Sequence, residues 1–558
     1  MNTNYLKLEQ GCLNPHQINL LNMINKKNKR EYVSLLDKIF LNTNRNKKWI
    51  FSPLFSRDFV QSSFFSDLNF LGLVDYLKKN KKIKKVKVKN IFLKKIIEEK
   101  YPDLNVKINI TTATNHIFLK YYGIILNFIK LFICTLFMIT SKNEERKNFF
   151  KGKKITLIET FFSKNLIQNN KFKERYNKEA YLRFPKTLRK QSFFFPINLS
   201  ILHIKKFLKI TKKDNIKFIH PLDFLNVRDY IESIFLIPLL KSIKNEPIFY
   251  KKFEISRLVK IYNFYSFFNF STFLANLNFN FLKRLKENNI KIDLILDWYE
   301  NQIIDKGISM GKNEFFKDSK IKGHMGFLND FRNIHYYYPT KLEHKLKCVP
   351  EEILLINKNI YRKFFKNNHY IKYKIVPSSR NQEIFGINKI KMKKKINKRI
   401  LLFILSANQQ ESNFIFKLIE NVHHKFDLSK NEIRIKTHPN TKLSYFIKKS
   451  KNIEISNKSV YEEILNSEIV IGGGTTATIE AQILNKKIIL IGNNSEIMLN
   501  PLMIHDKKSV KICYDSKTLF KNIIDFTKMK SRKNLINKNL LNYYFLKFTR
   551  SLNKNFYN

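Results

Sequence analysis

Cysteine is scarce in this chain of 558 residues, which has four: Cys12, Cys134, Cys348 and Cys513. They are widely scattered and form no CxxC pair, so we expect neither a structural zinc site nor a disulfide framework. The pattern fits a reducing cytoplasm. The first residues also lack the apolar run of a secretory signal peptide, and we therefore expect a cytoplasmic protein.

Acidic residues, glycine and proline are few as well. The chain has 45 Asp and Glu against 104 Lys and Arg, a formal net charge of +59, and 13 each of glycine and proline. A charge this large usually indicates an anionic partner, such as nucleic acid or an acidic membrane surface. The lysines, however, are spread over the whole chain, and no RNA-binding aromatic signature, zinc-finger spacing or helix-turn-helix pattern accompanies them. We expect no nucleic-acid partner and favour peripheral contact with anionic lipid.

One segment raises a membrane question. Residues 121–140 form an apolar run of a length that suits a bilayer span. Lys130 lies near its middle and opposes insertion, and Asn127, Lys130 and Cys134 fall on one less apolar stripe of a helix. Three interpretations stay open: a buried helix, a helix in the plane of a membrane, and a true span. The run that follows, 142–154, is basic and suits a cytoplasmic membrane face.

Apolar residues make up 44% of the chain and charged residues 27%, which is normal for a globular protein, and the length predicts two or three domains. In the C-terminal half, short apolar runs alternate with helix-length segments. We predict strands at 399–406, 433–436, 468–471 and 487–491, and helices at 411–424, 460–466 and 476–485. Strands separated by helices indicate a parallel sheet with helical crossovers. The loops after the strands would then lie at one edge, where ligands bind in such sheets.

Three consecutive glycines interrupt this pattern in a chain that has few. Gly472, Gly473 and Gly474 follow the third strand, and Thr475 and Thr476 open the next helix. Glycine lets the backbone approach an anion, and a helix N-terminus supplies N–H groups and a positive dipole end. The sequence therefore predicts a phosphate-binding turn, with a tight turn without ligand as the alternative. The motif is neither GxGxxG nor Walker type, so NAD binding or ATP hydrolysis is not implied.

Two titratable residues belong to the same predicted edge. His438 follows the second strand, where its imidazole could donate to a diphosphate oxygen. Glu480 lies one helical turn beyond Thr476, where its carboxylate could accept from ribose hydroxyls. The alternatives are a structural histidine and a helix-face glutamate that balances Lys486 or Lys487.

The first half has weaker signals. Apolar runs predict strands at 154–161 and 290–298, and the lysine-rich alternation at 83–88 predicts an exposed edge strand. Glu300 follows the second of these runs in a polar and aromatic cluster, where its carboxylate could act as general base for an acceptor hydroxyl. A helix-capping or salt-bridged glutamate is the alternative. Arg380 lies near a lysine-rich stretch and could reach a donor phosphate.

Six short motifs occur in order between residues 290 and 500: Trp298-x-Glu300-Asn301-Gln302, Gly323-His324-x-Gly326-Phe327, Pro339-Thr340-x-x-Glu343, Val376-Pro377-x-x-Arg380, His438-Pro439, and Gly472 to Thr476 with Glu480-Ala481. In this order they resemble bacterial surface-carbohydrate biosynthesis proteins of the GT-B type, including O-antigen-associated transferases. A more distant resemblance runs to the CDP-glycerol glycerophosphotransferases and capsule Kdo transferases. These share a His-Pro element and a later Ser/Thr-rich turn with Glu-Ala.

The resemblance implies an α/β, GT-B-like fold, in which two Rossmann-like domains face a cleft and the N-terminal half carries helical additions. We divide the chain into an irregular N-terminal extension (1–45), an acceptor-side domain (46–388), a linker (389–398), a donor-binding Rossmann-like domain (399–530) and a C-terminal tail or helix (531–558).

It also implies a metal-independent glycosyltransferase that has no cofactor and uses a nucleotide sugar as substrate. The donor-binding residues would be His438, Gly472, Gly473, Gly474, Thr475, Thr476 and Glu480. Glu300 would be the base, and Arg380 would stabilise leaving-group charge. The acceptor would be a surface polysaccharide or a lipid-linked molecule at the inner face of the cytoplasmic membrane. The alternatives are a polyol-phosphate transferase or nucleotide-sugar epimerase of the same fold, and a non-catalytic membrane-docking protein of a polysaccharide locus.

Overall fold

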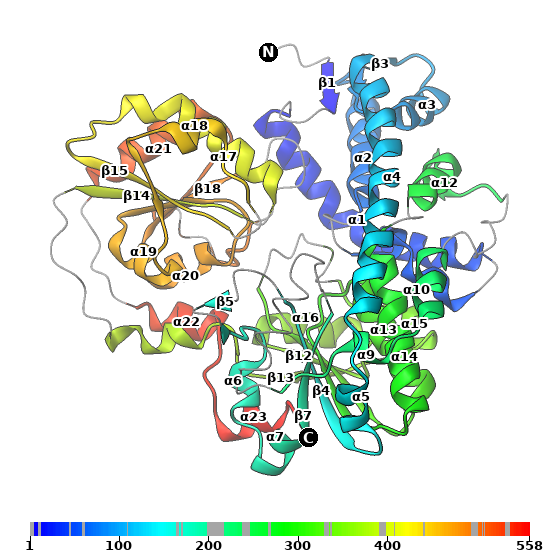
Figure 1. The fold of residues 1–558 in the computed structure, drawn as a ribbon. Helices are drawn as coiled ribbons and strands as arrows, with labels where there is room; N and C mark the ends of the chain where they lie inside the picture. The colour runs from blue at the N-terminus through cyan, green and yellow to red at the C-terminus, as the bar shows by residue number, and fades with distance from the viewer. Residues whose placement is uncertain are drawn as a thin grey trace.

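The structure, a computed structural model, contains three parallel sheets and two short antiparallel strand pairs, with helices packed around them (Figure 1). It describes residues 5–8, 13–43, 46–57, 62–108, 110–162, 167–168, 171–197, 217–236, 246–265, 269–328, 334, 337–389, 398–406, 408–438, 441–492, 500–504, 506, 508–529 and 536–558. Two of the parallel sheets have six strands each. The expected α/β, GT-B-like class with two parallel sheets is confirmed.

The N-terminal segment contains a long helix, so the prediction of an irregular extension was wrong. Helix α1 (Pro15–Leu41) begins with a capping box. The Asn14 side chain accepts from the Gln17 backbone N–H at 2.9 Å, and the Gln17 side chain accepts from the Asn14 backbone N–H at 3.1 Å. Buried polar residues such as Asn25 and Asn28 on its inner face interrupt the helical spacing of apolar residues, so the sequence pattern does not indicate this helix.

The same segment supplies a strand to a small sheet. Strand β1 (Tyr5–Leu8) pairs with β2 (Lys85–Val88), and β2 also pairs with β3 (Asn105–Ile108). The stretch 83–88, predicted as an exposed edge strand, therefore supplies the central strand of this sheet. Helices α2 (Phe64–Lys79) and α3 (Ile91–Lys100) alternate with these strands along the chain.

The first six-stranded sheet has the order β13-β12-β11-β10-β4-β7. Its strands are β4 (Lys154–Thr160), β7 (Ser192–Pro196), β10 (Lys291–Asp297), β11 (Lys320–Met325), β12 (Glu352–Leu355) and β13 (Lys372–Ile375). The strands predicted at 154–161 and 290–298 are confirmed as β4 and β10, which lie side by side in parallel register. Their short apolar runs are typical of strands buried on both faces.

Helices cover this sheet, and two of them touch backbone to backbone. Helices α13 (Phe270–Glu287) and α14 (Ile303–Phe315) pack so closely that a Cβ at Gly307 would lie 2.0 Å from the Ala275 carbonyl oxygen. The other helices of this half are α5 (Glu144–Phe150), α6 (Lys178–Tyr181), α7 (Lys186–Gln191), α9 (Pro221–Phe224), α10 (Val227–Ile234), α12 (Ser256–Tyr265), α15 (Lys341–Lys345) and α16 (Lys358–Asn367). The short strand pairs are β5 (Ile167–Gln168) with β6 (Lys171–Phe172), and β8 (Phe249–Tyr250) with β9 (Phe253–Glu254).

The second six-stranded sheet has the order β16-β15-β14-β17-β18-β19. Its strands are β14 (Arg399–Ile404), β15 (Asn431–Lys436), β16 (Ile453–Ser456), β17 (Ile469–Gly472), β18 (Lys487–Ile491) and β19 (Val510–Cys513). The helices between them are α17 (Gln409–Val422), α18 (Tyr445–Lys449), α19 (Val460–Asn466), α20 (Ala477–Ile483) and α21 (Ser516–Lys528). The four predicted strands and three predicted helices are confirmed. The two edge strands, β16 and β19, were not predicted, because each mixes apolar with polar residues and forms no continuous apolar run.

The C-terminal segment returns to the first half of the chain. After the second sheet come α22 (Lys538–Tyr544) and α23 (Arg550–Lys554). The Asn357 side chain donates to the Tyr543 carbonyl at 2.8 Å, and the Asn555 side chain donates to the Ile375 carbonyl at 2.8 Å. The chain therefore passes twice between the halves. Most of the predicted linker, 389–398, lies outside the described residues.

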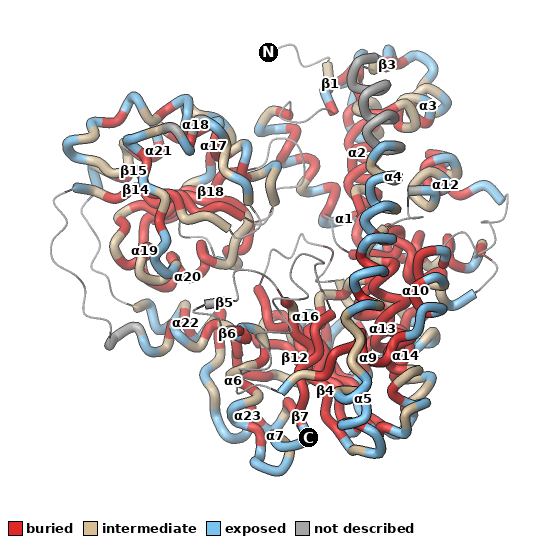
Figure 2. The backbone as a smooth tube through the Cα atoms, in the orientation of Figure 1, coloured by how far each residue is buried: buried red, intermediate tan, exposed pale blue. Residues whose placement is uncertain are grey.

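Helix α4 (Ile110–Thr140) contains the apolar segment 121–140. One side of it packs on the core through Leu131, Cys134 and Met138, while the other side is exposed between Tyr122 and Phe137 (Figure 2). The interpretation of this segment as a fully buried helix was therefore wrong. In the described part of the chain no single helix meets the length and hydropathy expected of a membrane crossing; the pair Ile125–Thr140 and Glu144–Phe150, bent by 73°, meets them together.

Candidate active site

The residues predicted to bind and react follow the carboxyl ends of parallel strands. In the second sheet, His438 comes after β15 and Gly472 is the last residue of β17. In the first sheet, Glu300 follows β10 and Arg380 follows β13. The structure thus places them at the sheet edges where ligands bind in folds of this class.

A hydrogen bond joins the two halves at this edge. Glu480, in the first turn of α20, is 7% exposed. Its Oε1 accepts from Asn381 Nδ2 at 3.0 Å and from the Tyr461 hydroxyl at 3.0 Å, and Asn381 belongs to the loop after β13. Burial raises the pKa of Glu480, while the Tyr461 hydrogen bond and the charges of Arg380 and Arg175 oppose that shift. Glu480 is therefore a contact between the halves, not a charge on an outer helix face.

Two guanidinium groups lie near this carboxylate. The charge of Arg380, followed by burial, lowers the pKa of Arg175, so the two guanidinium groups repel each other electrostatically. Neither forms an ion pair with a carboxylate among the residues that the structure describes. Two neighbouring cations repel each other, and an anion bound between them would relieve the repulsion. The pair is therefore suited to a phosphate-bearing ligand.

His438 shares this environment. Burial, together with the charges of Arg380 and Arg175, lowers the pKa of His438 to about 4. At neutral pH its imidazole is therefore uncharged, with one nitrogen able to donate and the other to accept. The predicted neighbours His438, Arg380 and Glu480 are thus brought together by the fold.

Arg175 is held by a loop with its own anchor. The loop follows β6, and the carboxylate of Glu174 accepts from the backbone N–H groups of Tyr176 and Asn177, each at 2.9 Å. The hydroxyl of Thr160, at the end of β4, donates to the same carboxylate at 3.1 Å. Burial raises the pKa of Glu174 to about 7, against these hydrogen bonds. The first sheet therefore positions Arg175 although the arginine itself is exposed.

Glu300 is oriented by its neighbours in sequence. The Trp298 indole N–H donates to its Oε1 at 2.9 Å, and the Gln302 amide donates to its Oε2 at 2.7 Å. The Tyr176 ring packs 4.8 Å from that of Trp298. Burial raises the pKa of Tyr176, the charge of Arg380 lowers it, and that of Glu300 raises it, so Tyr176 lies within reach of both charges. Glu300 is therefore in the same region as the arginines.

The glycine-rich turn contains a carboxylate of the same domain. The Gly474 N–H donates to Glu411 Oε1 at 3.0 Å, and a Cβ at Gly473 would lie 2.0 Å from that oxygen. A side chain at 473 would therefore require the Glu411 carboxylate to move. Burial raises the pKa of Glu411, while its hydrogen bonds to Ser406 and Gly474 oppose the shift. Phosphate binding by Gly472 to Thr476 stays a prediction, and Glu411 is the residue that competes with it.

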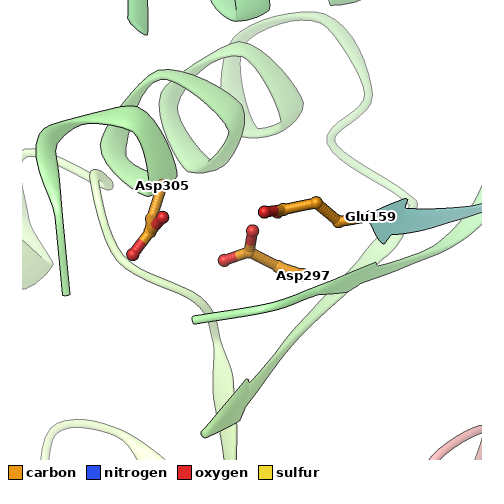
Figure 3. A group of neighbouring side chains, drawn as sticks. All are labelled: Glu159, Asp297 and Asp305. Carbon is orange, nitrogen blue, oxygen red and sulfur yellow. The ribbon is translucent and has the colours of Figure 1, made fainter. Parts of the chain in front are cut away.

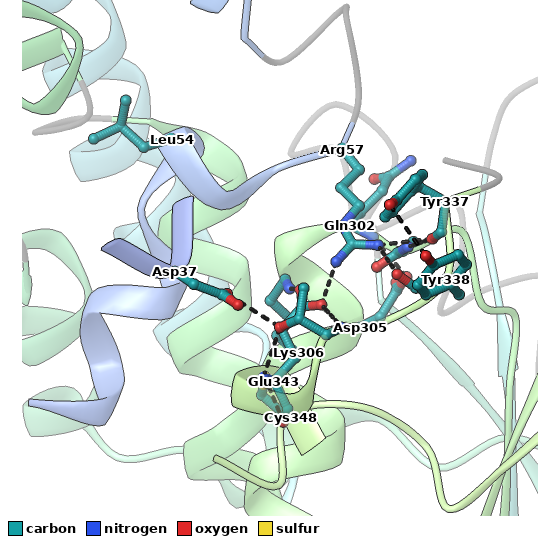
Figure 4. A network of polar contacts seen from close by, with 12 residues as sticks. Asp37, Leu54, Arg57, Gln302, Asp305, Lys306, Tyr337, Tyr338, Glu343 and Cys348 are labelled. Carbon is teal, nitrogen blue, oxygen red and sulfur yellow. Dashed lines mark hydrogen bonds and ion pairs between the residues drawn. The ribbon is translucent and has the colours of Figure 1, made fainter. Parts of the chain in front are cut away.

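Two of the resembling motifs serve the core. In Pro339-Thr340-x-x-Glu343, Glu343 forms buried ion pairs with Arg57 and Lys306 (Figure 4). Arg57 also donates to the Tyr337 and Tyr338 carbonyls at 2.7 and 2.9 Å. Both carboxylate oxygens of Glu343 are therefore held by cations inside the protein, and this residue serves the core.

The Gly323-His324-x-Gly326 motif is also internal. His324 lies in β11 and is fully buried, and its Nδ1 is 2.7 Å from Asn177 Oδ1. A Cβ at Gly326 would lie 2.3 Å from the Trp298 ring, so this glycine makes room for the indole that orients Glu300. Burial lowers the pKa of His324 to about 3. The motif supports the site from below and does not line it.

Three buried carboxyl groups lie beneath Glu300. Glu159 of β4, Asp297 of β10 and Asp305 of α14 point toward one another, with one oxygen of each within 4.8 Å of the others (Figure 3). Asp305 Oδ2 also accepts from the Glu300 and Gln302 backbone N–H groups, each at 2.9 Å. Oxygen ligands at this spacing suit a hard cation such as Mg²⁺ or Ca²⁺. The sequence reading expected no metal, and these residues are where that prediction can be tested.

When no cation is bound, the pKa values of these three carboxyl groups are raised. Burial raises the pKa of Asp297 to about 6, and burial with the neighbouring charge of Asp297 raises the pKa of Glu159 well above its usual range. Burial and the charge of Asp297 also raise the pKa of Asp305. The three groups therefore bind protons more readily than exposed carboxyl groups do.

Replacing Asp297 by asparagine is expected to stabilise the protein more at pH 8 than at pH 5. The pKa of Asp297 is raised in the folded state, so its contribution to stability is present below the unfolded pKa of 3.8 and is lost as the pH rises through about 6. The variant avoids that loss, which is at most about 3 kcal/mol. Urea denaturation across this pH range measures the difference.

Asp293→Asn is the matched control, because Asp293 lies on the same strand and is 48% exposed. We expect its stability to follow that of the wild type. A bound divalent cation would reverse the prediction, since it needs ionised carboxylates: Mg²⁺ or Ca²⁺ would then stabilise the wild type and not Asp297→Asn.

The sequence reading missed several residues of this region. Arg175 stands among 104 basic residues, and no local pattern separates it from the others. Asn381 and Tyr461 contact Glu480 from segments far apart in the chain. Glu411 opens a predicted helix, where an acidic residue is ordinary.

No family model and no curated protein matches the chain. Among solved structures, UDP-GlcNAc 2-epimerase from Neisseria meningitidis bound to UDP-GlcNAc is 10% identical, covering 70% of this chain and 95% of its own, with a TM-score of 0.40. The UDP-GlcNAc 2-epimerase of Methanocaldococcus jannaschii in complex with UDP-GlcNAc and UDP is 12% identical, with coverages of 69% and 96% and a TM-score of 0.38. An α,α-trehalose-phosphate synthase (UDP-forming) from Burkholderia vietnamiensis is 6% identical, with coverages of 68% and 91% and a TM-score of 0.32. These similarities concern the layout of the chain, and no residue role or activity is carried over from them.

Proposed function

We propose that the protein is a glycosyltransferase that moves a sugar from a nucleotide-activated donor to a surface polysaccharide or a lipid-linked acceptor. The observation that carries the proposal is the pair Arg175 and Arg380, close together beside Glu480 and His438, with no carboxylate ion pair in the described part of the chain. A nucleoside diphosphate sugar brings negative charge that both guanidinium groups can bind.

Each group then has a distinct role toward the donor. The two guanidinium groups bind the diphosphate, and Arg380 stabilises the charge that develops on it as the sugar leaves. The neutral imidazole of His438 donates a hydrogen bond to a phosphate oxygen. Glu480 Oε1 is engaged by Asn381 and Tyr461, which orients the carboxylate so that Oε2 can accept from ribose hydroxyls. In this proposal the arginines supply the positive charge, so the transfer is metal-independent.

Glu300 is the proposed base on the acceptor side. It would take the proton from the acceptor hydroxyl as that oxygen bonds to the anomeric carbon and the bond to the diphosphate breaks. The Trp298 and Gln302 hydrogen bonds hold the carboxylate in one orientation, which favours proton transfer from a hydroxyl in a defined position.

Binding of nucleoside diphosphates tests the donor site. We expect wild-type protein to bind at least one of UDP, CDP, GDP and ADP by calorimetry, and both Arg175→Ala and Arg380→Ala to weaken that binding by roughly tenfold or more, because a hydrogen bond to a charged group contributes about 1.5–3 kcal/mol. Glu480→Gln should weaken the binding of nucleosides as well as that of nucleoside diphosphates, since Glu480 is proposed to contact the ribose that both contain.

Arg257→Ala is the matched control, because Arg257 is an exposed arginine of α12 paired with Glu99. It should bind like the wild type. Failure of all four nucleotides to bind would contradict both this proposal and its enzymatic alternatives. Product analysis then distinguishes the transferase from the epimerase, with sugar derivatives of the nucleotide that binds as substrates. Release of the nucleotide with a glycosylated acceptor supports the transferase, and conversion of the sugar without release of the nucleotide supports the epimerase.

A further inference from the structure

Helix α4 exposes a continuous apolar face. Eight large side chains on it are between 40% and 57% exposed: Tyr122, Ile125, Leu126, Ile129, Phe132, Ile133, Leu136 and Phe137. We refer to these residues as the α4 face. Single exposed apolar residues are ordinary on a protein surface, but a contiguous apolar patch usually marks a place where another surface binds.

The geometry of the helix explains why these residues form one surface. At 3.6 residues per turn they fall within an arc of about 140°, and from Tyr122 to Phe137 they extend about 22 Å along the axis. Leu131, Cys134 and Met138 fall on the opposite side and pack into the core. Between Phe128 and Ile139 the helix is therefore packed on the protein along one side, while its apolar side chains on the other side are exposed.

A second helix widens this surface. Val227 and Ile231 of α10 are each 52% exposed, and Phe235, just after its end, is 41% exposed. The Phe235 ring lies 6.5 Å from the ring of Phe128 on α4, which places the two helices side by side (Figure 1). Phe149, after the bend that follows α4, is 57% exposed. The apolar surface thus continues beyond a single helix.

Basic residues border this surface. Lys130 is exposed at the edge of the α4 face, and Arg228 on α10 is 84% exposed. The run 142–154, which continues from the end of α4, has six basic and two acidic residues. Cations around an apolar face are complementary to a lipid surface with anionic headgroups, which attracts basic residues near the membrane.

We propose that the α4 face docks on an anionic lipid bilayer, with α4 lying in the plane of the membrane and its apolar side chains at the boundary between headgroups and acyl chains. A second copy of this chain is a poorer occupant, because it would bring another net charge of +59 against the first. The proposal rests on exposure and charge in this region and is independent of the donor site.

Vesicle flotation with the full-length protein tests the proposal. We expect the wild type to float with vesicles of phosphatidylcholine and phosphatidylglycerol, and less with phosphatidylcholine alone or at high salt. The double variant Leu126→Glu and Leu136→Glu should lower the partition coefficient by roughly tenfold or more, because it replaces two apolar contacts with charges that repel the anionic surface. These leucines are 45% and 50% exposed, so the fold should tolerate the change.

The matched control is Leu41→Glu with Leu182→Glu, since these leucines are 48% and 44% exposed elsewhere on the molecule. It should float like the wild type, with the thermal unfolding temperature of both variants unchanged. Equal flotation of the two double variants would overturn the proposal, as would the absence of wild-type binding to anionic vesicles. A wild-type dimer in ultracentrifugation that Leu126→Glu with Leu136→Glu converts to monomer, without vesicle binding, would assign the α4 face to a second copy instead. Nucleotide binding by the Leu126→Glu with Leu136→Glu variant should be unchanged.

Discussion

Replacing Glu343 by glutamine is expected to lower the free energy of unfolding by about 3–5 kcal/mol, because it leaves two buried cations without their counter-charge. Arg57 and Lys306 are each 1% exposed, and both pair with the Glu343 carboxylate. The Thr340 backbone N–H also donates to it at 2.8 Å. Urea denaturation at neutral pH measures the loss.

The pH dependence gives the same prediction a second readout. Burial would raise the pKa of Glu343, but the charges of Arg57 and Lys306 exceed that effect and lower it to about 2. Its stabilising contribution is therefore present above the unfolded pKa of 4.5 and is lost as the pH falls through about 2. The stability difference between the wild type and Glu343→Gln should accordingly shrink on acidification.

An exposed ion pair provides the comparison. Glu179→Gln removes the partner of Arg183 on the surface, where side chains are 35% and 41% exposed. Its effect should stay below about 1 kcal/mol. If Glu343→Gln is no more destabilising than Glu179→Gln, the buried network does not hold the first half together as described.

Replacing Glu300 by glutamine is expected to lower the turnover of sugar transfer by roughly 10²–10⁴-fold, the usual range for loss of a general base, while leaving nucleotide binding unchanged. Glutamine keeps the size of the side chain and can still contact Gln302, so the loss would reflect the missing proton acceptor. Steady-state kinetics with the donor identified by calorimetry, and flat pH dependence of the residual rate, are the measurements.

Control variants distinguish a catalytic role of Glu300 as general base from a role in stabilising the fold. Glu314→Gln, an exposed glutamate on the neighbouring α14, should keep full activity. A similar fall in turnover for Glu300→Gln and Trp298→Phe, accompanied by lost stability in both, would indicate that the cluster serves the fold. Normal turnover by a well-folded Glu300→Gln would exclude Glu300 as the base.

The second sheet shows where local sequence is sufficient. Its strands β14, β17 and β18 are apolar runs buried on both faces, and the helices between them have their own polar and apolar sides. Period and length are properties of consecutive residues, so a pattern such as 487–491 locates a strand before any tertiary contact is known. The same pattern placed His438 and Gly472 at one edge of the sheet.

Tertiary contacts decided what the local patterns could not. Helix α1 was missed because its inner face contains asparagines, and the Asn28 side chain donates to Asn69 Oδ1 at 3.1 Å in the core. The three glycines do not show by themselves whether a bound anion or Glu411 contacts the turn, because glycine only leaves room for either. Whether a glutamate lines a site or is buried in the core likewise depends on its partners, as Glu480 and Glu343 show.

The sequence by itself determined the α/β class, the parallel strands of the second sheet and the positions of His438, Gly472 and Glu300 at the ends of strands, because these follow from the period and length of apolar runs. Tertiary structure alone decided that Arg175 joins Arg380, that Glu411 occupies the glycine turn, and that the α4 face points outward while Leu131 and Cys134 point inward. An apolar run indicates that at least some of its side chains are buried. Which of these side chains are buried depends on contacts with segments far away in the chain.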